Sequence, residues 1–239
     1  MQPLSNIKIV SKQEYLTQNK KPNQQQVWDE IAKPWKTYVV KQIPAVKDFL
    51  KNKKGKIIDL GCGTGRNMIP NKNITYYGID FSKNQLIQAK KHIKLNNIKA
   101  KLFKSKAQDL KKIKDNTFDH GLFIASLHCI ETKENRKKAL EEFHRVLKPK
   151  AKAILTTWNS TDKRFKHIKN KGSIYMSWRE HNIPHMRYYY LYKKQELTNL
   201  IKSVGFKILS FKTHEEKNDQ IVDRFTKKNY ILILEKNKQ

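Results

Sequence analysis

The sequence predicts an α/β fold, in which a doubly wound and mostly parallel sheet of seven strands carries helices on both faces. Three observations support this prediction. Short apolar, β-branched runs alternate with helical patterns between residues 57 and 158. The first run ends in a turn with glycine at every other position. The second ends in a carboxylate about 20 residues beyond the first glycine, the separation found in βαβ nucleotide sites.

The elements follow from hydrophobic periodicity, taken in chain order. Residues 27–35 and 39–50 have apolar side chains at helical spacing, ahead of strands at 57–60 and 75–80. Further helices are expected at 84–95, 131–147 and 196–204, the last ended by Gly205 as a C-cap. Further strands are expected at 98–103, from Phe118 onward, at 151–158, and as a closing antiparallel pair at 206–211 and 230–234.

The length of 239 residues suits one α/β domain with a full-sized core. We expect residues 27–239 to form this domain and the polar residues 1–26 to be a loosely ordered leader. No apolar run is long enough to cross a bilayer, and the N-terminus has no signal-peptide core, so we expect a cytoplasmic protein without membrane contact. Cys62 and Cys129 are too few for a disulfide framework or a metal site.

The glycine turn at residues 61–65 is the main candidate for a ligand site. A strand that ends in such a turn and feeds a helix brings backbone N–H groups close to a ligand. We therefore select Asp59, Gly61, Cys62, Gly63 and Gly65 as cofactor-binding residues. The third glycine of a dinucleotide fingerprint would fall on Arg66, so a nicotinamide cofactor fits poorly.

Asp80 and Phe81, at the tip of the second strand, extend this site. The Asp80 carboxylate is placed to accept hydrogen bonds from two ribose hydroxyls. Its alternative role is to cap the next helix, but Ser82 is the better N-cap. Asp59 also has an alternative role, as a carboxylate that braces the loop through backbone amides.

The net charge of +30 has two interpretations. A strongly basic chain suits a phosphate-rich partner, which means nucleic acid. Alternatively, lysine is raised by compositional bias, since only seven of the 51 basic residues are arginine. The segment 159–192 interrupts the βα alternation and interleaves basic with aromatic residues, as a single-stranded nucleic-acid surface does. Its alternative is an ordinary insertion whose tyrosines fold over the core edge.

Three motifs together resemble class I S-adenosylmethionine-dependent methyltransferases. They are the Asp-x-Gly-x-Gly-x-Gly turn, the Phe118-Asp119 pair that opens a strand, and Leu147-Lys148-Pro149 before another strand. The resemblance implies S-adenosylmethionine as cofactor. It places Ile124 at the strand end that faces the transferred methyl group. It also places Ala107 and Gln108 beside the adenine, with Lys106 where an acidic residue is usual.

A closer resemblance is to the eukaryotic tRNA wobble-uridine methyltransferases, which esterify 5-carboxymethyluridine, and to the methyltransferase domain of the AlkB-homologue tRNA modifier. It rests on residues 27–32, the glycine turn, residues 125–128, Trp158 and, most specifically, the arginine and tyrosine block at 187–192. The resemblance implies tRNA as substrate. It also implies a small zinc-binding activator protein as partner, docked along the sheet edge.

A carboxylate acceptor is already ionised at neutral pH and needs no general base. Our hypothesis is that Arg187 and His128 orient this carboxylate, while Tyr188 and Tyr189 shape the pocket. The alternatives are a phosphate clamp for Arg187 and a structural strand-end role for His128. For the whole chain, the alternatives are a small-molecule methyltransferase and a non-catalytic RNA-binding protein. The intact glycine turn and Asp80 argue against the second.

Overall fold

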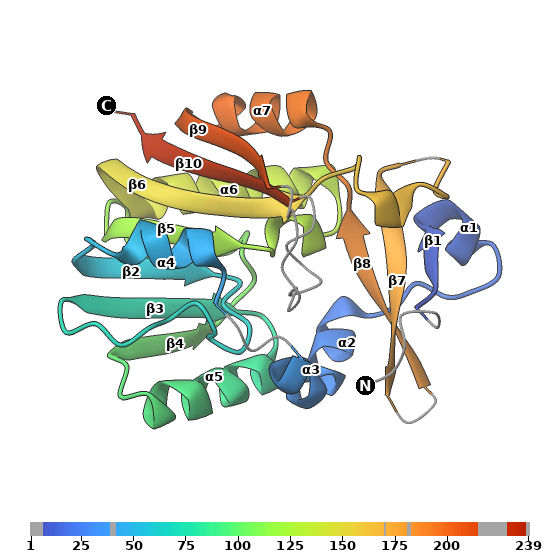
Figure 1. Cartoon of the computed structure of the whole chain (residues 1–239), viewed down its shortest axis with the longest axis horizontal. Helices are drawn as coiled ribbons and strands as arrows, with labels where there is room; N and C mark the ends of the chain where they lie inside the picture. The colour runs from blue at the N-terminus through green and yellow to red at the C-terminus, as the bar shows by residue number, and fades with distance from the viewer. Residues whose placement is uncertain (1–6, 39–41, 170, 181–182, 215–228, 238–239) are drawn as a thin grey trace.

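The computed structural model describes residues 7–38, 42–169, 171–180, 183–214 and 229–237 (Figure 1). Its main sheet has seven strands in the order β4-β3-β2-β5-β6-β10-β9. They are β2 (Gly55–Leu60), β3 (Ile74–Asp80), β4 (Ala100–Lys104), β5 (Phe118–Ile124), β6 (Leu147–Trp158), β9 (Phe206–His214) and β10 (Asn229–Lys236). The pairs from β4 to β6 are parallel, and β10 runs antiparallel to both neighbours. The predicted doubly wound sheet is confirmed.

Helices cover both faces of the sheet because successive strand residues point to opposite sides. Ile57 packs in one core with α4 (Pro44–Leu50) and α5 (Lys83–Leu95). Its neighbour Ile58 packs in the other core with α6 (Lys133–Val146) and α7 (Lys194–Ser203). These α/β layers hold the carboxyl ends of the parallel strands together along one side of the sheet, towards the middle of the molecule (Figure 1).

The helices ahead of the sheet are shorter than expected. In place of one helix over 27–35 there are α2 (Gln24–Glu30) and α3 (Ala32–Tyr38), which meet at Ile31, where ψ is near 1°. The expected helix at 39–50 is reduced to α4, which begins at Pro44. Proline favours the first turn of a helix because its ring fixes φ and it has no N–H to donate. Val39 and Val40, expected on the apolar face, lie outside the described residues.

A second, three-stranded sheet lies beyond the carboxyl ends of the parallel strands (Figure 1). It consists of β1 (Ile9–Ser11), β7 (Ser173–Glu180) and β8 (Ile183–Tyr190), all antiparallel, with the short helix α1 (Lys12–Leu16) beside β1. Residues 7–26 therefore differ from the loosely ordered leader that we expected. Val10 of β1 is buried against Tyr175 and Tyr188, and this contact gives the polar segment its place.

The tyrosines of segment 159–192 are buried rather than displayed. The rings of Tyr175, Tyr188, Tyr189 and Tyr192 are at most 2% exposed. Tyr175 and Tyr188 form a small core with Val10 of β1, Tyr189 packs in another with Trp158, and Tyr192 packs in the core of the main sheet. These rings are thus unavailable for stacking bases, which agrees with the alternative in which they fold over the core edge.

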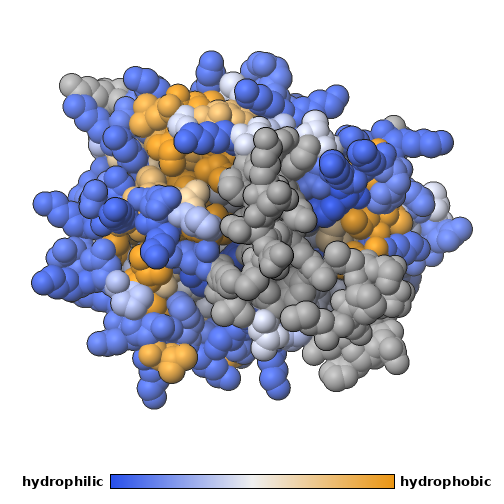
Figure 2. Space-filling view, in the orientation of Figure 1, coloured by the Kyte–Doolittle hydropathy of each residue, from blue (hydrophilic) through white to orange (hydrophobic). Residues whose placement is uncertain are grey.

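The surface is dominated by charge. Figure 2 shows polar residues over most of one face, with an apolar patch over β9 and β10. Within the described ranges, none of the helices has the length and apolar character needed to cross a bilayer. In the same ranges no group of three or more His, Cys, Asp and Glu side chains is arranged to hold a metal ion. Cys62 and Cys129 are free thiols.

Candidate active site

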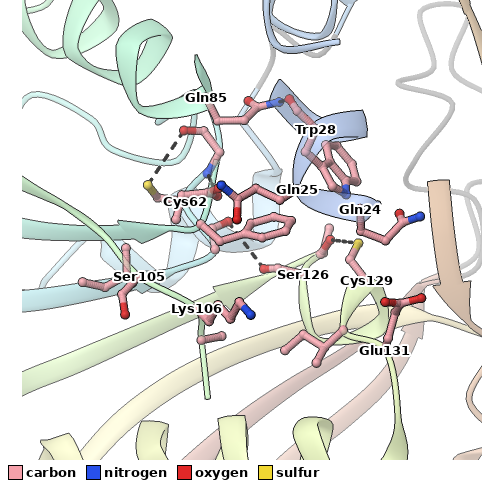
Figure 3. Close-up of a pocket in the computed structure, with 18 of the residues that line it drawn as sticks. Gln24, Gln25, Trp28, Cys62, Gln85, Ser105, Lys106, Ser126, Cys129 and Glu131 are labelled. Atoms are coloured by element: carbon pink, nitrogen blue, oxygen red, sulfur yellow. Dashed lines mark hydrogen bonds between the residues drawn. The ribbon is translucent and has the colours of Figure 1, made fainter. Parts of the chain in front are cut away.

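A cavity of about 580 Å³ opens at the carboxyl ends of β2, β3 and β5. This volume lies within the range of about 300 to 1,000 Å³ that is typical of cofactor sites. Eight of the ten expected cofactor residues line it: Gly61, Cys62, Gly63, Asp80, Phe81, Ala107, Gln108 and Ile124. Ser105 and Lys106 from the turn after β4 lie on one side of the cavity, across from Gln25 and Trp28 of α2 (Figure 3).

Each glycine of the turn has its own structural reason. Gly61 has φ +72°, and an added Cβ would lie 2.1 Å from the Ser126 Oγ. At Gly63, with φ +53°, an added Cβ would lie in ordinary van der Waals contact, 3.7 Å from the Gln85 Oε1, so the positive φ alone calls for glycine. Gly65, with φ +79°, is outside the cavity wall and packs against Ala89 of α5, 3.3 Å from an added Cβ. Glycine is suited to all three positions because it adopts positive φ without strain.

Asp80 is held by the backbone at the tip of β3. Its Oδ2 accepts from the Gly63 N–H at 2.8 Å, and its Oδ1 accepts from the Ser82 N–H at 2.9 Å. Burial raises its pKa to about 6, and these hydrogen bonds limit the rise. Ser82 is the N-cap of α5, since its hydroxyl accepts from the Gln85 N–H. Each carboxylate oxygen keeps capacity for a further hydrogen bond from a ligand hydroxyl in the cavity.

Asp59 lies behind the glycine turn, outside the cavity wall. It is completely buried, and among the described residues neither carboxylate oxygen has a hydrogen-bond partner. The alternative in which it accepts backbone amides therefore finds no support in this part of the chain. Burial raises its pKa to about 7, the charge of Asp80 adds to the rise, and Arg66 opposes it. The site thus holds two buried carboxyl groups beneath one turn, an environment that favours a cationic ligand.

Residues from the N-terminal part of the chain complete the cavity, and they are not among the site residues expected from the sequence. Gln24, Gln25 and Trp28 of α2 line it, as does Trp35 of α3. In the close-up view, α2 faces Cys129 and Glu131 from the segment after β5 (Figure 3). The one signal in the sequence was the helical pattern ahead of the first strand, which predicts a helix here but not which side chains line the cavity.

Three of the four expected catalytic residues lie together behind this cavity. The His128 ring is 5.6 Å from the Tyr189 ring, and the Arg187 guanidinium carbon is 5.4 Å from the same ring. Arg187 is 1% exposed, and Nη2 donates to the Ser177 carbonyl at 3.1 Å. Its Nε and Nη1 have no hydrogen-bond partner among the described residues. Trp35, which lines the cavity, has its ring 5.4 Å from the guanidinium carbon.

Tyr188 is separated from the other three residues, which differs from the expectation that it shapes the pocket. Alternate residues of a strand point to opposite faces, so Tyr188 points away from the side of β8 that carries Arg187 and Tyr189. Its hydroxyl bonds to Ser173 at 2.8 Å and accepts from Arg136 at 3.2 Å. It packs in the small core of the three-stranded sheet.

His128 matches its structural alternative. It lies in a short 3-10 turn, Leu127–Cys129, with Nδ1 3.0 Å from the Thr157 Oγ1 and its ring stacked on Trp158 at 4.9 Å. Burial lowers its pKa to about 3, and the charge of Arg164 adds to the effect. The ring is therefore neutral at physiological pH, and it does not line the cavity.

Comparison with known proteins then decides the family. A family model described as a methyltransferase domain matches residues 51–232. The chain belongs to this methyltransferase family. The match confirms the class I methyltransferase fold and S-adenosylmethionine as the cofactor, which the glycine turn and Asp80 had predicted.

Relatives of this methyltransferase have names that agree with the resemblance seen in the sequence. The tRNA (carboxymethyluridine(34)-5-O)-methyltransferase of Schizosaccharomyces pombe is 28% identical over 211 residues, which cover 77% of this chain and 88% of the relative. The protein alkbh8 of Xenopus tropicalis, with the same activity name, is 29% identical over 149 residues, covering 61% of this chain and 22% of that longer protein.

Among solved structures, this chain is similar to a chain in the complex between the Haloferax volcanii Trm112 methyltransferase activator and a methyltransferase. The TM-score is 0.67 at 14% identity, and the match covers 92% of this chain and 100% of the other. At 14% sequence identity, this similarity shows a shared fold and no more.

Proposed function

We propose that this methyltransferase esterifies the carboxylate of 5-carboxymethyluridine at the wobble position of tRNA. The names of the two relatives support this substrate, as does the arginine and tyrosine block at residues 187–192. The observation that carries the proposal is the buried guanidinium of Arg187, which has no carboxylate partner in the described part of the chain. Such a cation favours an anionic ligand, since an unpaired buried charge costs several kcal/mol, of order 3 to 5.

The surroundings of Arg187 fit a carboxylate that enters from the cavity. The guanidinium carbon lies 5.4 Å from the Trp35 ring and 5.2 Å from the Trp178 ring, so two aromatic faces hold it. Arg187 also acts on Cys129, a cavity residue: burial raises the pKa of this thiol and the charge of Arg187 opposes the rise. A carboxylate between Trp35 and Cys129 would find donors on this guanidinium, because Nε and Nη1 have no hydrogen-bond partner among the described residues.

The residues present suit S-adenosylmethionine as the methyl donor. Asp80 has free acceptor capacity for ribose hydroxyls, and Gly63, whose N–H donates to Asp80, lines the same cavity. The buried Asp59 and Asp80 provide negative potential for a positively charged ligand. Bound there, S-adenosylmethionine would supply an electrophilic methyl group on a cationic sulfur.

The rest of the chemistry requires alignment more than proton transfer. A carboxylate acceptor is ionised at neutral pH, so no side chain has to remove a proton from it. This agrees with the cavity lining, which has no histidine among the described residues. The task left to Arg187 is to hold the carboxylate oxygen in line with the methyl group, and such positioning is worth several powers of ten in rate.

Substitution of Arg187 tests this role. We expect Arg187→Ala to lower kcat/KM for tRNA that carries 5-carboxymethyluridine by about 100-fold or more, because the buried charge partner of the substrate is lost. Arg187→Lys retains the charge without the fork and is expected to recover only part of the activity. The affinity for S-adenosylhomocysteine, measured by calorimetry, should stay within about twofold, since Asp80 and the glycine turn are unchanged.

Equal losses of cofactor affinity and of transfer would contradict the role of Arg187. Transfer to small carboxylic acids with none to tRNA would favour a small-molecule methyltransferase instead.

We also propose that a small zinc-binding activator protein binds along β4, the edge strand of the main sheet. An edge strand presents unpaired N–H and C=O groups to which a partner strand can add. Apolar side chains surround this edge: Phe103 on β4 is 43% exposed, and Leu95 at the end of α5 is 83% exposed. The similar fold in the Haloferax volcanii complex with an activator supports a partner of this kind.

The two edges of the sheet provide a matched pair of variants. Co-expression with candidate activators and size-exclusion chromatography should give a complex that Phe103→Asp disrupts. Leu209→Asp is the control, since Leu209 is 40% exposed on β9 at the opposite edge. If Leu209→Asp disrupted the complex and Phe103→Asp did not, the partner would not bind at the β4 edge.

A further inference from the structure

Helix α2 connects the cofactor site with the hairpin that carries Arg187. At its C-terminal end, the Asp29 carboxylate accepts from the Ser82 hydroxyl at 2.6 Å and from the Asn84 N–H at 3.0 Å. Ser82 is the same residue whose N–H donates to Asp80. These bonds fix α2 to the start of α5, directly beside the carboxylate that faces the cofactor cavity.

Gln24, the first residue of α2, makes the contact at the other end. Its Nε2 donates to the Met186 carbonyl at 3.1 Å, and its Oε1 accepts from the Tyr188 N–H at 2.8 Å. Gln24 is 7% exposed, and the two backbone groups that it binds stand on either side of Arg187 in the chain. One side-chain amide therefore holds the backbone on both sides of the proposed substrate arginine.

The geometry of an antiparallel strand explains this contact. Backbone groups of alternate residues face the same edge of a strand, so those of Met186 and Tyr188 face one edge and those of Arg187 the other. Arg187 lies opposite Met176 of β7, and β8 is the last strand of its sheet. The Gln24 amide thus takes the place that a further strand would occupy. Without it, two buried backbone groups would lose their partners, at about 1 to 3 kcal/mol each.

We infer that Gln24 is a positioning residue for Arg187. Through its two ends, α2 fixes the position of Arg187 relative to the cofactor site. The inference rests on the proposed function, in which Arg187 holds the substrate carboxylate. Among the residues that the structure describes, the Arg187 guanidinium has one hydrogen bond, to Ser177, so its position depends on where the β8 backbone is held. Gln24 holds that backbone, and Asp29 holds Gln24 at a fixed distance from Asp80.

The substitution Gln24→Met tests this inference, because methionine has a similar shape but neither donor nor acceptor of comparable strength. The matched control is Gln26→Met, the same change on the same helix, where the side chain is exposed and bonds to Glu30. A second variant, Gln24→Glu, keeps an acceptor for the Tyr188 N–H and loses the donor to Met186. Hydrogen exchange of the Tyr188 amide reports the contact without any need for activity.

We expect exchange of the Tyr188 amide to accelerate at least tenfold in Gln24→Met, with less change in Gln24→Glu and none in Gln26→Met. The kcat for tRNA with 5-carboxymethyluridine should fall about 10- to 100-fold in Gln24→Met, the usual cost of misplacing a catalytic group by about 1 Å. The dissociation constant of S-adenosylhomocysteine should remain within about twofold.

Unchanged exchange at Tyr188 would overturn the inference, as would a loss of cofactor affinity equal to the loss of kcat. If the wild-type protein does not methylate tRNA, the proposed function is wrong. The exchange data would still decide whether Gln24 holds β8. Should Gln24→Met fail to fold, Gln24→Glu provides the same comparison against Gln26→Met.

Discussion

Replacing Asp59 with asparagine should stabilise the protein at alkaline pH, although Asp59 lies next to the cofactor site. Its carboxyl group is completely buried, without a hydrogen-bond partner among the described residues, and its pKa is raised from 3.8 to about 7. Because the folded state binds this proton more tightly than the unfolded state does, the free energy of unfolding falls as pH rises from about 4 to about 8.

The magnitude follows from the displacement of the pKa. A rise from 3.8 to about 7 corresponds to about 4 kcal/mol of lost stability above the folded pKa, at 1.36 kcal/mol per pH unit. The asparagine side chain of the variant stays neutral at every pH, but its buried amide costs about 1 to 2 kcal/mol where it finds no partner. The variant should therefore be more stable by about 2 kcal/mol at pH 8 and less stable by about 1 to 2 kcal/mol at pH 4.

Urea unfolding followed by tryptophan fluorescence measures both values. The decisive quantity is the change in the stability difference between pH 4 and pH 8, since the cost of the amide cancels from it. Asp119→Asn is the control of opposite sign: burial raises the pKa of Asp119, but hydrogen bonds from Lys148 and the Lys56 N–H outweigh burial and hold it below 3.8. A difference for Asp59→Asn that is independent of pH, or a variant less stable at pH 8, would refute the reasoning.

Three further predictions concern the glycine turn, the C-terminal strand and the surface charge. Gly61→Ala should lower both the melting temperature and the affinity for S-adenosylhomocysteine, because its Cβ would lie 2.1 Å from the Ser126 Oγ. Gly172→Ala should change neither, because the nearest atom to its Cβ would be 3.9 Å away. Lys236→Met should lower the free energy of unfolding by about 1 to 3 kcal/mol, because the buried ammonium donates to the Leu147 carbonyl at 2.8 Å and the Asn116 amide oxygen at 2.9 Å. Binding of tRNA should weaken with salt, with a slope of log K against log salt of about −2 or steeper; a flat dependence in a filter-binding series would argue against phosphate contacts.

The cofactor half of the site could be predicted from the sequence because its determinants are local. Gly61, Gly63 and Asp80 are defined by spacing after two strands, and the parallel sheet brings the ends of those strands together. Gly65 could be selected from the same spacing, but its role in packing against Ala89 depends on how closely α5 approaches.

The substrate half could be predicted only in part, because it depends on distant contacts. Strand β1 has three residues, too few for a periodic signal, and its partner β7 lies more than 160 positions along the chain. The interleaving of basic and aromatic residues marks segment 159–192 as distinct in the sequence, but it does not say which rings are covered. Two features become visible only once the hairpin is folded: Tyr188 and Arg187 point to opposite faces of β8, and Gln24 contacts the backbone of β8.

The most direct test of the proposed reaction is the chemical nature of the methylated product. Transfer RNA with a free acid on its wobble uridine would be incubated with the protein, the proposed activator and S-adenosylmethionine labelled in the methyl group. The product would then be treated with mild alkali. Esterification by the Arg187 site predicts label that mild alkali releases as methanol, and no label when a carboxamide replaces the acid. Label that resists alkali, or equal labelling of the carboxamide, would mean that a ring or ribose atom is the acceptor and would contradict the role given to Arg187.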